Sequence, residues 1–122
     1  MITGLPPTAG TNLDLRCLRN IAKLYVDDVF WGKIEGETTE IVFNEIGKRM
    51  TIETSDNFQH MVIYAPPHGR FICMENLASC PNAPNLQDSR YSGMANMLVA
   101  KPGQTITGWI QYTIEALKSI PA

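Results

Sequence analysis

Short runs of alternating apolar and polar residues dominate the chain from residue 38 onward, and they constrain its fold more than any other feature. The runs are rich in Ile, Val, Thr, Phe and Tyr, and turn-forming residues separate them at intervals typical of antiparallel sheets. They cover residues 39–43, 49–54, 58–64, 70–75, 94–100 and 105–114. We therefore predict six strands within residues 38–115 and an all-β fold class.

Two of the predicted connections contain residues that favour specific turns. Asn44-Glu45-Ile46-Gly47-Lys48 joins the first two strands as a hairpin loop, in which Gly47 supplies a positive φ. Lys101-Pro102-Gly103-Gln104 has proline in the second position and glycine in the third, as a type II turn requires. Both connections support antiparallel pairing of the strands that flank them.

The run at residues 70–75 is apolar on both of its faces. Ile72 and Met74 alternate with Phe71 and Cys73, so each face of the strand presents side chains that favour burial. A sheet built from such strands is expected to be covered on both sides. The sequence therefore predicts an antiparallel β-sandwich.

Residues 1–37 differ from the rest of the chain. The first 20 residues are dense in Gly, Pro and Asn, which suits a loop better than a regular element. Apolar residues between Leu13 and Tyr25 can also form one face of a short helix capped by Asp14, and this alternative stays open. We predict a single domain of 122 residues, in which residues 1–37 are a largely irregular N-terminal segment.

Charge and composition exclude several classes of protein. The net charge is −2 and no Lys/Arg cluster occurs, so we expect no nucleic-acid partner. No run approaches the roughly 18 apolar residues of a membrane span, and the N-terminus lacks signal-peptide features, so we expect no membrane partner and a cytoplasmic location. Cys17, Cys73 and Cys80 form neither a disulfide set nor a Cys-x-x-Cys pair and are predicted to be reduced thiols.

Glu75 is the first candidate functional residue, because it ends a hydrophobic run at the point where a polar loop begins. It shares a strand face with Phe71 and Cys73, and partial burial there would raise the pKa of its carboxyl group towards the range of a general base. The alternative is a strand-end glutamate that lies in solvent or pairs with Arg70. We carry both interpretations to the structure.

Asp27-Asp28-Val29-Phe30-Trp31 is the second candidate, because it sets two carboxylates beside two aromatic rings. Carboxylates such as that of Asp27 accept hydrogen bonds from sugar hydroxyl groups, and the face of an aromatic ring such as Trp31 stacks on sugar C–H groups. The same segment can instead cap a turn. The sequence leaves these two possibilities open.

The two histidines complete the set of candidates. His60 lies in a predicted strand and is expected to be packed or partly exposed, whereas His68 lies in a turn, where it is expected to be exposed and can serve at the rim of a site. Two isolated histidines are too few for a metal site with Cys73 or Cys80, so no metal is expected. No Ser-His-Asp order, phosphate-binding glycine loop or calcium loop is present, which argues against nucleophilic and phosphoryl-transfer enzymes.

Six segments along nearly the whole chain contain residue patterns that together suggest a family. In order they are Thr11-Asn12-Leu13-Asp14-Leu15-Arg16, Val26-Asp27-Asp28-Val29-Phe30, Tyr64-Ala65-Pro66, Phe71-Ile72-Cys73-Met74-Glu75, Pro81-Asn82-Ala83-Pro84-Asn85-Leu86, and Gly93 with Leu98, Pro102 and Gly103. Their order and spacing resemble the C-terminal portion of aldose 1-epimerases, the galactose mutarotase family. Gln104 stands where that family has a closing glutamate.

The resemblance implies a galactose mutarotase-like β-supersandwich, of which this chain would supply the later strands. In that family the glutamate matching Glu75 is the general base that takes the C1 hydroxyl proton of an aldose. The aspartate matching Asp27 binds sugar hydroxyls, and no cofactor is needed. The family's proton donor is a histidine from the earlier half of the fold, assisted there by a second histidine and an arginine. Neither His60 nor His68 matches these histidines, so the resemblance implies an isomerase chain that is incomplete by itself.

Several interpretations of such a chain stay open. It can be a fragment, one chain of a split enzyme, or a sugar-binding remnant. A different class is a β-sandwich carbohydrate-binding module that uses Asp27, Trp31 and His68 as contacts without catalysis. The expected ligand is a hexose such as galactose or glucose. An apolar face without its packing partner favours association, so we also expect a homo-oligomer or a partner chain that supplies the missing half.

Overall fold

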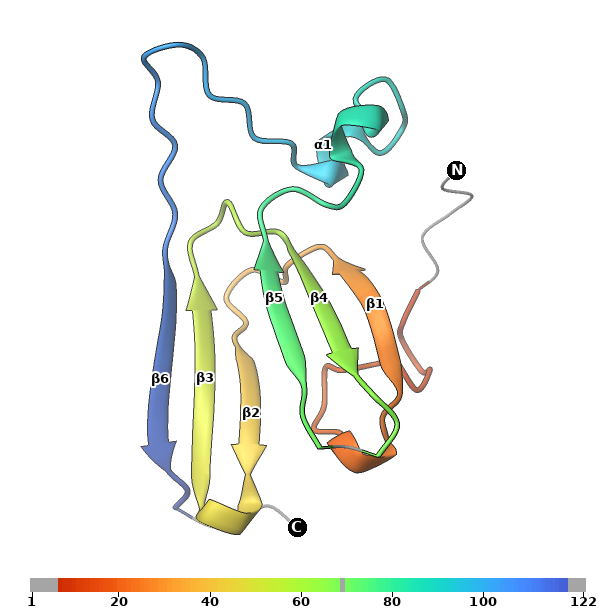
Figure 1. The fold of residues 1–122 in the computed structure, drawn as a ribbon, viewed down its shortest axis with the longest axis vertical. Coiled ribbons are helices and arrows are strands. Elements are labelled where there is room, and N and C mark those ends of the chain that lie inside the picture. The colour runs from red at the N-terminus through yellow and green to blue at the C-terminus, as the bar shows by residue number, and fades with distance from the viewer. Residues whose placement is uncertain (1–6, 69, 119–122) are drawn as a thin grey trace. The chain divides into compact units, whose positions relative to one another are not determined.

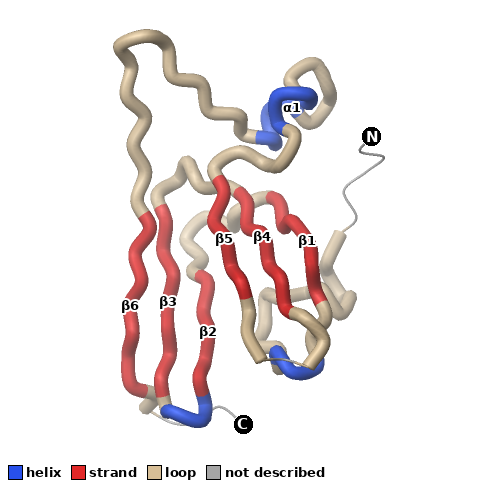
Figure 2. Tube along the Cα trace, viewed as in Figure 1, coloured by secondary structure: helices blue, strands red, loops and turns tan. Residues whose placement is uncertain are grey.

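The computed structural model describes residues 7–68 and 70–118 of the chain. Within these ranges the regular structure is six strands, one α-helix of four residues and three short 3-10 helices (Figure 1). The strands form two antiparallel three-stranded sheets, in the orders β1-β4-β5 and β2-β3-β6 (Figure 2). The predicted all-β fold class, with the two antiparallel sheets that a sandwich-like fold requires, is confirmed.

The chain divides into two compact units, neither of which is continuous in sequence. The first unit comprises the residues up to Phe30 together with Met61–Glu75. The second comprises Trp31–His60 together with the residues from Asn76 onward. The β1-β4-β5 sheet lies mainly in the first unit, and the β2-β3-β6 sheet lies in the second.

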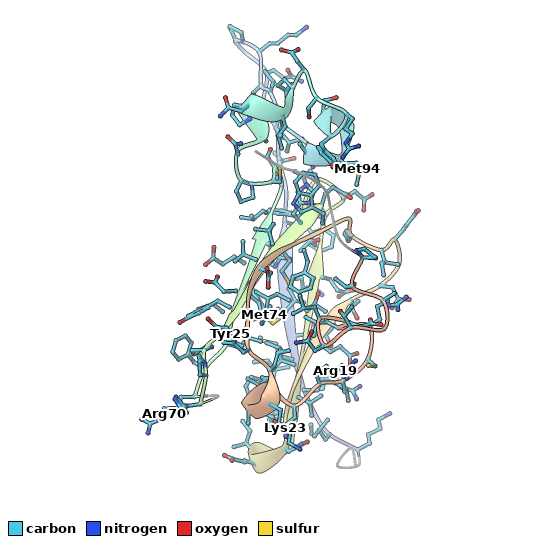
Figure 3. All side chains as sticks on the ribbon, turned by 90° about the vertical axis from the view of Figure 1, so that its right-hand side faces the viewer. Arg19, Lys23, Tyr25, Arg70, Met74 and Met94 are labelled. Carbon is cyan, nitrogen blue, oxygen red and sulfur yellow. The ribbon has the colours of Figure 1, made fainter. Side chains whose placement is uncertain are left out.

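The first sheet consists of β1 (Val26–Trp31), β4 (His60–Ala65) and β5 (Cys73–Leu77), with β4 in the centre (Figure 1). One face of this sheet carries a hydrophobic core. The buried residues of this core are Leu24, Val26, Ile63 and Ala65. The partly buried residues packed against it are Leu13, Leu15, Ile21, Phe30, Met61, Ile72 and Met74, the last of which is labelled in Figure 3.

The second sheet consists of β2 (Thr39–Phe43), β3 (Lys48–Thr54) and β6 (Ile110–Ala116), with β3 in the centre. Its register sets Ile41 opposite Met50, and Ile52 opposite both Thr39 of β2 and Tyr112 of β6. Ile41 and Ile52 are buried. This sheet therefore has its own apolar contact region, centred on the two isoleucines.

Both predicted turns are confirmed. The β2–β3 connection contains the 3-10 helix η2 (Asn44–Ile46), which Gly47 ends with a φ of 61°. In the second turn Gly103 has a φ of 81°, and the Gln104 N–H donates to the Lys101 carbonyl at 2.8 Å. Glycine tolerates these left-handed conformations because it has no Cβ.

Strand β1 was not predicted, although most of the described residues before 38 are irregular, as expected. Aspartate is disfavoured in strands, so Asp27 and Asp28 mask the strand in the sequence. Pairing with the distant strand β4 stabilises it, and just beyond its end the Gly32 and Lys33 N–H groups both donate to the Gln59 carbonyl, at 3.1 and 3.0 Å. The alternative prediction of a short helix between Leu13 and Tyr25 is wrong, because the only helical residues in this segment form the 3-10 helix η1 (Ile21–Lys23).

The predicted strand at residues 94–100 is wrong. The helix α1 (Ser92–Ala95) covers the start of this segment and ends at Asn96, which has a left-handed φ of 52°. The Asn96 side-chain N–H₂ then donates to the carbonyls of Asn57, at 3.0 Å, and Ala78, at 2.9 Å. These long-range bonds fix an irregular path that the apolar alternation of the segment does not reveal.

The last strand begins later than predicted, at Ile110 rather than at residue 105. Side chains hold the preceding residues instead of a ladder. The Asn57 side chain donates to the Thr107 carbonyl at 2.9 Å, and the Trp109 N–H donates to the Ser55 hydroxyl at 2.9 Å. A further 3-10 helix, η3 (Ala83–Leu86), precedes α1. No helix in the described ranges has the length and apolar character needed to cross a membrane.

Candidate functional site

Asp27 and Glu75 lie on the two outer strands of the first unit's sheet, with β4 between them. Val26 is part of the hydrophobic core and Met74 packs against it. Because successive side chains of a strand point to opposite faces, their neighbours Asp27 and Glu75 project from the face that lies away from the core. We call this side of the β1-β4-β5 sheet the open face.

Tyr64 lies on the open face of the central strand, because its neighbours Ile63 and Ala65 are both in the core. Asp27 is the second residue of β1, Tyr64 the last but one of β4, and Glu75 the third of β5. In an antiparallel sheet the start of β1, the end of β4 and the start of β5 meet at the same end. The fold therefore sets two carboxylates and a phenol ring on one face of the sheet, with Asp27 and Tyr64 at this end and Glu75 at the middle of β5.

Both carboxylates of the open face are exposed to solvent. The expected partial burial of Glu75 is therefore not found, because Met74 rather than Glu75 points into the core and because Phe71 is itself 53% exposed. Phe71 packs edge-on against Tyr64, with 5.9 Å between ring centroids. Glu75 makes no ion pair with the residues that the structure describes, and the Arg70 side chain extends outward from the β4–β5 connection (Figure 3).

The geometry of the open face suits a small hydroxylated ligand. Strands β1 and β5 are separated by one strand, so their axes are about 10 Å apart. Two exposed carboxylates at that separation can accept hydrogen bonds from different hydroxyl groups of one ligand. Tyr64, on the strand between β1 and β5, supplies an aromatic ring on the same face.

His68 lies in the connection between β4 and β5, which is at the same end of the sheet as Asp27. It is exposed, as predicted, and has a left-handed φ of 85°. Asp27 and His68 thus lie at one end of the first unit's sheet, and Glu75 lies at the middle of β5.

Trp31 does not join this group. It belongs to the second unit, where its ring packs against His60 with 5.0 Å between centroids and against Tyr91 with 6.0 Å. Trp31 is partly buried by these contacts. Its predicted role as a stacking surface beside Asp27 therefore has no support in the geometry.

Among the described residues, His60 is the only buried residue with a charged or polar side chain, and 5% of its surface is exposed. It lines a hollow of about 220 Å³ together with Gly32, Gln59, Gly93, Met94 and Asn96, all in the second unit. Neither ring nitrogen has a hydrogen-bond partner among the described residues. Burial lowers the pKa of His60, and nearby peptide groups of Ala95 and Met94 partly oppose this shift.

The described residues contain no cluster of three or more His, Cys, Asp or Glu side chains that can hold a metal ion. Cys17, Cys73 and Cys80 are free thiols. Burial raises the pKa of Cys80, which disfavours its thiolate form and makes it a poor nucleophile.

Two features of the molecule escaped the sequence-based search for a site. Tyr64 was recognisable only as part of a strand, because its place between Asp27 and Glu75 depends on strand order. The hollow at His60 joins residues from three separate segments, and no local pattern marks it. Comparisons with models of known protein families, with curated proteins and with solved structures found no match for this chain.

Proposed function

We propose that the chain binds an aldose at the open face of the β1-β4-β5 sheet and takes part in interconverting its α and β anomers, as an isomerase of the aldose 1-epimerase type. One observation carries this proposal. Asp27 and Glu75, which are far apart in the sequence, are both exposed on one face of a single sheet. These are also the two positions at which the family resemblance places a sugar ligand and a general base.

Each residue has a defined role in the proposed reaction. Glu75 accepts the proton of the C1 hydroxyl while the bond between C1 and the ring oxygen breaks, and an acid protonates the ring oxygen. Rotation about C1–C2 and reclosure on the other face of the carbonyl give the second anomer, with the two proton transfers reversed. Asp27 accepts hydrogen bonds from other hydroxyl groups of the sugar and fixes its orientation, and His68 contacts the sugar at the rim.

We assign the acid to a second copy of this chain. The support is an apolar row on the edge strand β6, where Ile110, Tyr112 and Ile114 are 37%, 58% and 67% exposed. Edge strands and apolar patches of this kind favour association. Light scattering at micromolar concentration should therefore give the mass of an oligomer, and a monomer mass would contradict the proposed self-association.

A cytoplasmic location belongs to the same proposal. Its support is the three free thiols, one of them the exposed Cys17, because reducing compartments keep such thiols unpaired.

The decisive test is the optical rotation of freshly dissolved α-galactose and α-glucose in the presence of the purified protein. We expect faster mutarotation than in buffer, and we expect Glu75→Gln to lower the rate by the factor of roughly 10²–10⁴ that general bases contribute. Glu45→Gln, which changes an exposed glutamate of the second unit, is the matched control and should keep the rate. An unchanged rate in the Glu75 variant would remove Glu75 from the mechanism.

A second candidate function is sugar binding without catalysis. The exposure of Glu75 favours it, because no described residue forms an ion pair with this carboxylate. In this case Asp27 and His68 are contacts, and Trp31 is not, because its ring packs on His60 and Tyr91. Calorimetry would then show galactose binding that Asp27→Asn weakens, with no change in the rate of mutarotation.

A further inference from the structure

The hollow at His60 has the features of a built site rather than of a packing fault. Its wall combines a 95% buried imidazole with two glycines, Gly32 and Gly93, at which an added Cβ would meet no atom within 4 Å. The absence of side chains at these two positions keeps the hollow open. Trp31 packs on the imidazole from the side, with an angle of 52° between the two ring planes.

Both ring nitrogens of the buried His60 lack a hydrogen-bond partner among the described residues. This is unusual, because buried polar groups in folded proteins are nearly always hydrogen-bonded. A neutral imidazole carries one N–H donor and one lone-pair acceptor. A hydroxyl group can donate and accept, so a hydroxyl on a ligand can pair with either nitrogen.

The other lining residues narrow the class of ligand. Gly32, Gln59, Gly93, Met94 and Asn96 carry no charge, so nothing in the wall compensates an ammonium group or a carboxylate. The volume of about 220 Å³ is smaller than the roughly 300–1,000 Å³ of sites for drug-sized ligands, yet it exceeds the space that one water needs. A hydroxyl group on a compact neutral molecule satisfies both conditions.

We propose that the hollow at His60 binds a small neutral hydroxylated molecule, a polyol or a monosaccharide, whose hydroxyl group forms a hydrogen bond with an imidazole nitrogen of His60. This site is independent of the proposed function, because Asp27 and Glu75 belong to the first unit and take no part in it.

The chain supplies its own internal references for a test by NMR. It contains two histidines and two tryptophans. His60 and Trp31 lie at the hollow, whereas His68 and Trp109 are exposed and do not line it. We would titrate the protein with glycerol and with galactose and follow the ring protons of both histidines and the indole N–H of both tryptophans.

The expected result is a saturable shift at His60 and Trp31 with at least one of the two probes, without a comparable shift at Trp109. His68 is not a reference for galactose, because the proposed function places it in contact with a sugar. His60→Phe should abolish the shift of Trp31, because it keeps a ring and removes both nitrogens. Gly93→Val should weaken it by placing a side chain beside the hollow, and Ser92→Val, in the same short helix but outside the lining, is the matched control.

Three outcomes would overturn the proposal. They are no shift at His60 with either probe, equal shifts at Trp31 and Trp109, and a Trp31 shift that persists in His60→Phe. The valine variant keeps the test decisive if the phenylalanine variant fails to fold. Glu75→Gln separates the two proposals, because it should leave the His60 shift unchanged while it abolishes mutarotation.

Discussion

Lowering the pH from about 7.5 to about 5.5 should destabilise the protein through His60. Burial lowers the pKa of this imidazole in the folded protein, whereas in the unfolded chain it returns to its usual value of about 6.5. Between these two values the unfolded state binds a proton that the folded state does not bind. The free energy of unfolding therefore falls as the pH drops through about 6.5, and the full stability is present above that value.

The size of the effect follows from a single proton. If the pKa of His60 in the folded protein lies well below 5.5, only the unfolded chain takes up this proton between pH 7.5 and pH 5.5. The free energy of unfolding then falls by about 1.4 kcal/mol, the equivalent of one pKa unit. None of the other residues that line the hollow with His60 is titratable. The other histidine, His68, is exposed. The Arg16 guanidinium and the Gly10 N–H hold the pKa of Asp14 well below its usual range, so this carboxyl group titrates below the pH window.

Urea unfolding followed by circular dichroism at both pH values measures this loss. The wild-type protein should lose up to about 1.4 kcal/mol at the lower pH, and His60→Phe should lose clearly less. His68→Phe removes the exposed histidine and should keep the wild-type pH dependence. The reasoning is refuted if the His60 variant shows the same pH dependence as the wild-type protein, because the proton would then be taken up elsewhere.

Two further substitutions test the packing of the second unit. Ile52→Ala should lower the free energy of unfolding by about 2–5 kcal/mol, because this side chain is 96% buried, whereas Ile46→Ala at an exposed position should change little; equal effects in urea unfolding would contradict the assigned core. Gly108→Ala should cost about 1–3 kcal/mol, because its Cβ would lie 2.8 Å from the Asn57 side chain. Gly93→Ala, where a Cβ meets nothing within 4 Å, is its control in a thermal melt, and similar midpoints would mean that the loop at Gly108 adjusts freely.

The parts of the fold that were predicted from the sequence have local causes. The β2–β3 hairpin depends on two short alternating strands and on Gly47, which takes the left-handed conformation that the turn needs. The turn at Lys101–Gln104 depends in the same way on Pro102 and Gly103. Each of these causes lies within a few residues of the structure that it produces, so a pattern search finds it.

The parts that the sequence did not predict have distant causes. Strand β1 is paired with β4, and the irregular path after α1 is held by the Asn96 side chain on Asn57 and Ala78. Neither partner is near in sequence, and the local signals point the other way. Two aspartates argue against a strand in β1, and apolar alternation argues for one at residues 94–100.

In the candidate site, too, the residues were predicted from the sequence, whereas their relative placement was not. Asp27 and Glu75 were singled out from residue type and from the family resemblance, but only strand order places them on one face with Tyr64 between them. The predicted partial burial of Glu75 was wrong because the side chains of β5 alternate between the two faces of the sheet, and Met74 is the one that packs against the core. If the strand were shifted by one residue, Glu75 would face the core and Met74 would face away from it.

His60 links stability and binding in a way that separates a ligand site from ordinary packing. A buried imidazole without hydrogen bonds lowers the stability of the ligand-free protein by about 1–3 kcal/mol relative to a ring that needs none. His60→Phe should therefore stabilise the ligand-free protein and abolish the stabilisation that a bound polyol confers. If His60 only fills space, His60→Phe changes the stability of the ligand-free protein and leaves the stabilisation by an added polyol unchanged. The two effects have opposite signs only if the imidazole is present to form a hydrogen bond with a ligand.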